Sequence, residues 1–95
     1  MTDQIRVSCA AGEGGWACDV RVGPDGRDSR HLVTVTPGEL AHFAPGAAEP
    51  TTLVERSFEF LLEREAKESI MARFSLSTIE HYFPEYTRVI AGRFG

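Results

Sequence analysis

The sequence predicts an α+β domain in which a three-stranded antiparallel β-meander over residues 5–36 has one face covered by three to four helices from residues 37–91. The first observation is compositional. Residues 1–48 hold seven of the nine glycines, both cysteines and the tryptophan, whereas residues 49–95 hold five of the six phenylalanines and both tyrosines. The second is periodicity, because apolar residues alternate in the first part and recur every three or four residues in the second. A chain of 95 residues is too short for two domains, so we expect a single domain over residues 1–95.

A β-hairpin is predicted at the start of the chain. Apolar side chains alternate with polar or small ones over residues 5–10 and again over residues 16–22, the period expected of half-buried strands. The glycine-rich stretch 12–15 between them favours a tight turn. Directly opposite residues of an antiparallel pair point to the same face, so the apolar sides match when paired residue numbers add up to 27. This register places Cys9 opposite Cys18 on the core face.

A third strand is predicted over residues 31–36, after the turn sequence Gly-Pro-Asp-Gly at residues 23–26. Its apolar side joins the core face if paired residue numbers add up to 53, which places Val20 opposite Val33. The other face of the meander is then polar and carries Arg6, Ser8, Asp19, Arg21, Thr34 and Thr36.

Capping signals mark the starts of the first two helices. Thr36 and Glu39 form a capping box, which begins a short helix. The second helix is expected to begin near Pro50, with Thr52 and Glu55 as another capping box.

The second helix cannot continue straight to the end of its apolar row. This row has a spacing of four residues and comprises Val54, Phe58, Leu62, Ala66, Ile70 and Phe74. Four residues overshoot one helical turn by about 40°, so the row would wind around a straight helix, and we expect a kink or break near residues 65–69. Beyond it, Ser77 and Glu80 form a third capping box, which begins a short helix that Pro84 interrupts before a last helical turn.

The two cysteines are the candidate redox pair. Their predicted position on the core face favours two small buried thiols, and a disulfide is the alternative. The chain has no C-x-x-C motif and its three histidines are scattered, so we expect no metal site. A nucleophilic site of Cys9, Cys18 and His31 is disfavoured because the helices would cover all three side chains.

The aromatic segment at residues 82–86 supplies the candidate partner-binding residues, Tyr82, Phe83 and Tyr86. Tyrosine and phenylalanine are favoured at the centres of protein interfaces. The alternative, which a domain of this size favours, is that these rings close the hydrophobic core.

Residues 72–77 (Ala-Arg-Phe-Ser-Leu-Ser) and the following Tyr82-Phe83-Pro84 resemble the helix-turn-helix of TetR-type repressors. In that family an Ala-x-x-Gly-Val-Ser turn leads into a recognition helix that ends in Tyr-x-Tyr-Phe-Pro. The chain departs from the family in having Ser75 at the turn glycine, a shorter helix and no lysine or arginine in it. The resemblance implies DNA contacts from Ser77, Thr78 and His81. It gives one alternative function, a DNA-binding regulator with a degenerate helix-turn-helix at residues 69–83.

Charge and the lack of catalytic motifs decide the function we expect. The formal net charge is −4, and such an acidic chain does not indicate a surface that binds nucleic acid or an anionic membrane. No catalytic constellation, cofactor motif or small-molecule site stands out. We therefore expect a non-enzymatic protein of bacterial type that acts by contact with another protein or by self-association as a homodimer. A thiol redox protein using Cys9 and Cys18 is the second alternative. The first residues lack a basic and an apolar signal region, which predicts a cytoplasmic location.

Overall fold

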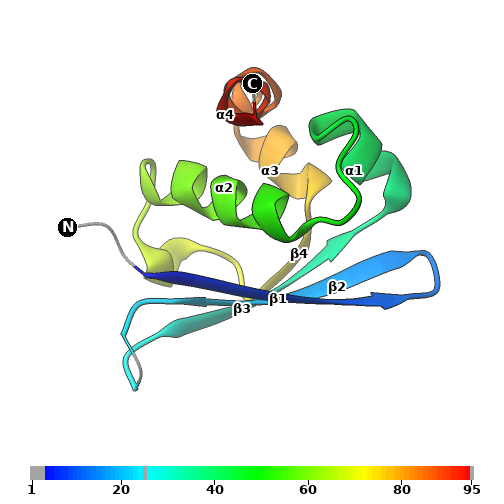
Figure 1. Cartoon of the computed structure of the whole chain (residues 1–95). Helices are drawn as coiled ribbons and strands as arrows, with labels where there is room; N and C mark the ends of the chain where they lie inside the picture. Colours follow the sequence, from blue (N-terminus) through cyan, green and yellow to red (C-terminus); the bar gives the residue numbers. More distant parts are fainter. Residues whose placement is uncertain (1–3, 25, 95) are drawn as a thin grey trace.

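The protein is an α+β domain of two layers, as predicted. The structure, a computed structural model, describes residues 4–24 and 26–94. Residues 1–3, on which the expectation about a signal region rests, lie outside this part. One sheet has the strand order β1-β2-β3-β4, and all the helices lie on one of its faces, while the other face is open (Figure 1). The elements are β1 (Ile5–Gly12), β2 (Gly15–Val22), β3 (Ser29–Val35), α1 (Pro37–Phe43), α2 (Thr51–Leu62), the 3₁₀ helix η1 (Lys67–Ser69), β4 (Arg73–Ser75), α3 (Ser77–Tyr82) and α4 (Tyr86–Phe94).

The register of the first hairpin is confirmed. Cys9 lies opposite Cys18 and Val7 opposite Val20, so paired numbers add up to 27. The turn requires glycine at position 15, where φ is +140° and an added Cβ would lie 2.1 Å from the carbonyl oxygen of Val35.

The predicted register between β2 and β3 is wrong by two residues. Paired numbers add up to 51, so Val20 lies opposite His31 and Cys18 opposite Val33. The cause is the turn, which a hydrogen bond from the Arg27 N–H to the Pro24 carbonyl closes at 3.0 Å. Asp25, within the predicted turn, lies outside the described residues. Because side chains alternate with a period of two, the shift leaves every residue on its predicted face.

A fourth strand completes the sheet and was not predicted. The expected break after the second helix is confirmed, since α2 ends at Leu62 and η1 follows. The chain does not resume a helix there but returns to the sheet, where β4 pairs in parallel with β3. The Leu32 N–H donates to the Ala72 carbonyl at 2.7 Å, and the Leu76 N–H donates to the Thr34 carbonyl at 3.0 Å.

One of the three predicted capping boxes is present. Glu39 and Thr36 exchange hydrogen bonds of 2.8 and 3.0 Å at the start of α1. The other two predictions are wrong: Pro50 and Leu76 are the N-cap residues of α2 and α3, and neither provides a side-chain cap. Ser77 instead donates from its N–H to the second carboxylate oxygen of Glu39 at 2.9 Å, which ties the start of α3 to the start of α1.

The core lies between the sheet and the helices. Most side chains of β2 and β3 that face the helices are buried, with Trp16 only half-buried. Ile5, Val7 and Cys9 on the outer strand β1 are also only half-buried. The innermost residues come from both layers: Cys18, Val20, Val22, Val33, Leu53, Val54, Phe58, Phe60, Leu76, Tyr86 and Ile90.

Candidate binding pocket

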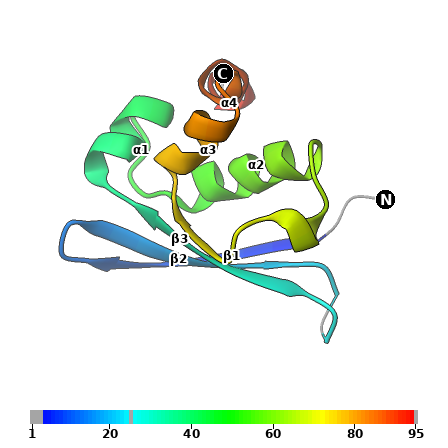
Figure 2. The same cartoon turned by 180° about the vertical axis from the view of Figure 1, so that it is seen from behind.

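An open pocket of about 420 Å³ lies on the helical side of the sheet, beside β4. The end of α2, the η1 segment, β4 and α3 surround it, and these elements come together around β4 in the view from behind (Figure 2). Most of its lining is apolar. The lining residues are Leu61, Glu65, Ser69, Ile70, Met71, Phe74, Thr78, Ile79, Tyr82 and Phe83.

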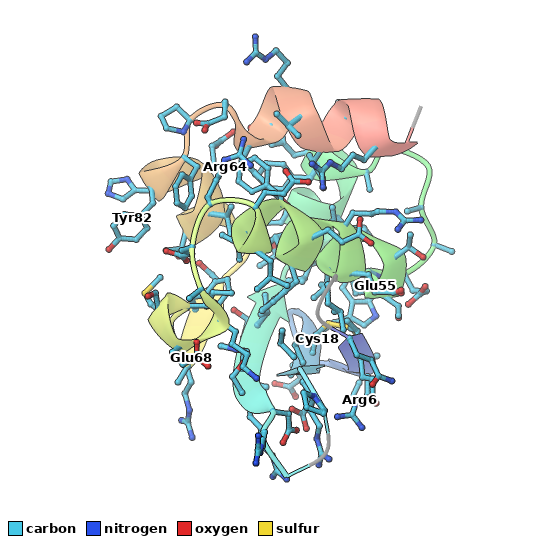
Figure 3. The ribbon with its side chains drawn as sticks, turned by 90° about the vertical axis from the view of Figure 1, so that its left-hand side faces the viewer. Arg6, Cys18, Glu55, Arg64, Glu68 and Tyr82 are labelled. Carbon is cyan, nitrogen blue, oxygen red and sulfur yellow. A yellow bond between two sulfur atoms is a disulfide. The ribbon has the colours of Figure 1, made fainter. Side chains whose placement is uncertain are left out.

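Two large apolar side chains are exposed at the pocket. Met71 is 42% exposed and Tyr82 is 62% exposed. Tyr82 projects from the molecule on the side where η1, which carries Glu68, also lies (Figure 3). Among the described residues, the only other exposed large apolar side chain is Leu32, at 37%, which lies opposite Arg73 of β4 on the open face of the sheet. Among the side chains that the structure describes, the exposed large apolar ones therefore lie around β4, which is typical of an interaction site.

His31 holds one wall of the pocket in place. Its Nδ1 donates to the carbonyl oxygen of Met71 at 2.8 Å, since a carbonyl can only accept. In the neutral ring Nε2 then accepts from the Ser29 hydroxyl, also at 2.8 Å. The ring is 4% exposed and lies 5.3 Å from that of Phe58. We conclude that His31 fixes the path of the chain from η1 into β4.

The structure separates the three candidate partner-binding residues. Tyr82 and Phe83 line the pocket, and Phe83 also packs against Phe60 with ring centres 5.9 Å apart. Tyr86 is fully buried, and its hydroxyl lies 2.6 Å from that of Ser57. Tyr82 and Phe83 thus lie at the pocket, and Tyr86 belongs to the core.

The expectation that Cys9 and Cys18 are free thiols is wrong. They form a disulfide across β1 and β2, with an S–S distance of 2.05 Å. Gln4 accepts from the Gly23 N–H, so the even-numbered residues of β1 occupy hydrogen-bonded pairs and Cys9 occupies a non-hydrogen-bonded pair, where opposite side chains are closest. His31 is bound to Ser29 and Met71, so it is not the base of a cysteine site. Among the described residues, no three histidine, cysteine or acidic side chains gather where they could share a metal ion.

The segment that resembles a helix-turn-helix has another local structure. Residues 73–75 form strand β4, where that motif needs a helix before its turn. Of the residues implied to contact DNA, Ser77 donates to Glu39, Thr78 lines the pocket and His81 is exposed.

Arginines also gather on the open face of the sheet. Arg6, Arg21 and Arg30 lie directly opposite one another across β1, β2 and β3. The nearly buried carboxylate of Asp28 lies 3.8 Å from Arg6 and 4.0 Å from Arg21, which offsets part of the repulsion within this row.

The sequence pointed to only part of this pocket. Ile70 and Phe74 were interpreted as members of an apolar helical row that breaks near residues 65–69, and Met71 carried no signal. The break expected at residues 65–69 was the one sequence signal for a pocket. Where the helix ends, the apolar residues that would have continued its buried row can line a surface instead.

Comparison with known proteins does not assign the pocket. None of the helices in residues 4–24 and 26–94 is long and apolar enough to cross a membrane. No protein-family model, curated protein or solved structure is significantly similar to this chain.

Proposed function

We propose that the protein is a non-enzymatic binding domain whose pocket beside β4 takes a bulky apolar side chain of a partner protein. The observation that carries this proposal is an open, largely apolar pocket with Met71 and Tyr82 exposed at it. Water-exposed apolar surface of this kind is removed from solvent by binding, and each buried apolar Å² contributes roughly 25 cal/mol.

The lining favours a protein partner over a metabolite. A volume of about 420 Å³ lies at the small end of ligand pockets, which span roughly 300–1,000 Å³. Sites for small polar molecules also need several convergent polar groups, and here only Glu65, Ser69 and Thr78 are polar. A projecting tyrosine beside an apolar pocket matches the anchors that dominate protein interfaces.

The test is peptide selection followed by calorimetry. Random peptides displayed on phage are selected against the immobilised full chain, and the enriched peptide is synthesised. We expect Tyr82→Lys to weaken its binding at least roughly tenfold. The matched control Ala10→Lys alters an exposed residue of β1, at the opposite edge of the sheet from β4, and should leave affinity within about twofold. Enrichment of no peptide, or equal losses in both variants, would contradict the proposal. Light scattering of the native protein and of Tyr82→Lys compares their oligomeric states. A lower mass of the variant would assign the pocket to self-association.

A second candidate function is favoured by the disulfide. Cys18 is fully buried, whereas Cys9 is half-buried on the outer strand and is the less buried of the two. Attack by a dithiol reductant on the Cys9 sulfur would form a mixed disulfide and release Cys18 as a thiolate. The second thiol of the reductant would then resolve it, giving two protein thiols and an oxidised dithiol. Equilibration with dithiol buffers of stated potential tests this candidate. If the Cys9–Cys18 disulfide stays oxidised in a buffer set to the reduction potential of the cytosol, it is structural and the redox function is excluded.

The proposed location is the cytoplasm, and the disulfide makes this testable. Structural disulfides persist in oxidising compartments and are rare in the cytosol. Acid quenching of cells followed by thiol alkylation measures the state of Cys9 and Cys18. Reduced cysteines fit the cytoplasm, and fully oxidised cysteines point to an oxidising compartment.

A further inference from the structure

The partner segment has two surfaces to bind at this site, the pocket and the edge of the sheet beside it. β4 is the last strand of the sheet, and β3 is its only neighbour in the described structure. The Ala72 carbonyl and the Leu76 N–H bond to β3, so the backbone groups of residues 72, 74 and 76 point inward. Backbone direction alternates along a strand, so the N–H and C=O groups of Arg73 and Ser75 point away from β3.

These outward groups have no backbone partner in the described part of the chain. Both residues are exposed. An unpaired edge of this kind is a template for an added strand. The N–H and C=O groups of Arg73 and Ser75 could all form hydrogen bonds with the backbone of one short extended segment.

Resting on the proposed function, we propose that the partner binds as an extended strand added to the edge of β4, with a bulky apolar side chain in the pocket and an acidic side chain next to it in the strand, beside Arg73. Phe74 of β4 faces the helices and lines the pocket, so an added residue that points to the same face enters the pocket. Its two neighbours in the added strand point to the open face of the sheet, because side chains alternate.

Charge on the open face sets the neighbours of the apolar residue. Arg73 lies on that face opposite Leu32, and Arg30 lies two residues before Leu32 on the same face. No carboxylate of the described residues lies within 4.0 Å of either guanidinium, in contrast to Arg6 and Arg21 beside Asp28. Opposite charges on adjacent strands attract and like charges repel, so acidic residues are favoured beside Arg73. The partner segment therefore has a bulky apolar residue with an acidic residue directly next to it at the position beside Arg73, whereas the neighbour on the other side lies beside the uncharged Ser75.

The experiment uses the peptide enriched on the full chain and single N-methylated versions of it. N-methylation removes one donor, and in an added strand only every second amide faces β4. We expect alternate N-methylations to weaken binding roughly fivefold to tenfold and the amides between them to be tolerated. A bound helix would give no such alternation.

Charge exchange gives an independent readout. Arg73→Glu should weaken binding of the acidic peptide roughly tenfold, and a peptide with lysine in place of the acidic residue beside position 73 should regain affinity for this variant. The matched control is Arg27→Glu, in the β2–β3 connection, which should change affinity by less than about twofold.

The outcomes separate the two proposals. Binding that Tyr82→Lys abolishes, but that shows no alternation and no response to Arg73→Glu, overturns strand addition and leaves the pocket as the binding site. If Tyr82→Lys leaves the affinity unchanged, both the pocket as the binding site and strand addition at β4 are overturned. Dimerisation that Arg73→Glu abolishes would assign the edge to a second copy and also overturn the proposal.

Discussion

Tyr86 and Ser57 show how one polar pair fixes the inside of the helical layer. The Ser57 hydroxyl has a single proton and donates it to the Leu53 carbonyl at 2.7 Å, so Tyr86 is the donor in its 2.6 Å bond to Ser57. Both side chains are fully buried. The sequence predicted an aromatic role for Tyr86 but could not distinguish partner from core, because the choice depends on a serine 29 residues earlier.

Tyr86→Phe should lower the free energy of unfolding by about 1–2 kcal/mol, because it leaves a buried acceptor of Ser57 unsatisfied. Urea unfolding at neutral pH measures the change. The matched control Tyr82→Phe alters an exposed side chain and should stay within about 0.5 kcal/mol. Equal losses in the two variants would contradict the assignment of Tyr86 to the core.

Alkaline pH should destabilise the protein through the same residue. Burial raises the pKa of Tyr86 above its ordinary value of 10.0. Above that value the unfolded chain loses the phenolic proton while the folded chain keeps it, so the free energy of unfolding falls as pH rises. Urea unfolding at several pH values should show this fall in the native protein and a smaller one in Tyr86→Phe. Identical profiles would contradict it.

Among the elements, those built from local contacts could be predicted and those built from distant ones could not. Alternation and a glycine turn sufficed for the Cys9–Cys18 register, although they could not tell a disulfide from two thiols. The β2–β3 register depends on which residues close the turn. The bond between Arg27 and Pro24 centres the turn on paired numbers that add up to 51, whereas the predicted sum of 53 needs a turn one position further along the chain. Strand β4 has only three residues, too few to show the alternation of apolar and polar side chains that predicts a strand. Its partner strand β3 lies about 40 residues earlier in the sequence.

Reduction of the Cys9–Cys18 disulfide should lower the free energy of unfolding by about 2–3 kcal/mol, as expected for closing a loop with a sequence separation of 9. Urea unfolding with and without dithiothreitol measures this difference. The double variant Cys9→Ala/Cys18→Ala should show no response to the reductant. Equal free energies of unfolding for the oxidised and the reduced native protein would contradict this prediction.

Glu39 connects the starts of α1 and α3, and Glu39→Gln tests the connection. Burial raises the pKa of Glu39, but hydrogen bonds donated by Ser77 and Thr36 outweigh it and hold the pKa below the ordinary 4.5. The stabilisation is complete above pH 4.5 and is lost as pH falls through the folded-state pKa.

We expect Glu39→Gln to cost roughly 1 kcal/mol at neutral pH and to flatten the loss of stability in acid. Urea unfolding across the acid range measures both effects. Glu55→Gln removes the same charge from α2 and serves as the control. An acid profile of Glu39→Gln that matches the native protein would contradict the connection.

At the scale of the whole molecule, the pocket forms only when elements distant in the sequence pack together. Residues from α2, η1, β4 and α3 line the pocket, and His31 of β3 holds its wall. The sequence singled out Tyr82 and Phe83, and both line the pocket, although the interpretation favoured for a domain of this size was that these rings close the core. It could not predict the pocket itself, since that requires the return of the chain to the sheet at β4.

Amide hydrogen exchange of Arg73 and Ser75, followed by NMR during titration with the enriched peptide, tests strand addition at the pocket most directly. The account predicts that exchange of both amides slows at least roughly tenfold on binding, together with shifts in the signals of Met71, Phe74 and Tyr82. Unchanged exchange at Arg73 and Ser75, with the shifts confined to the open face of β1 and β2, would contradict it.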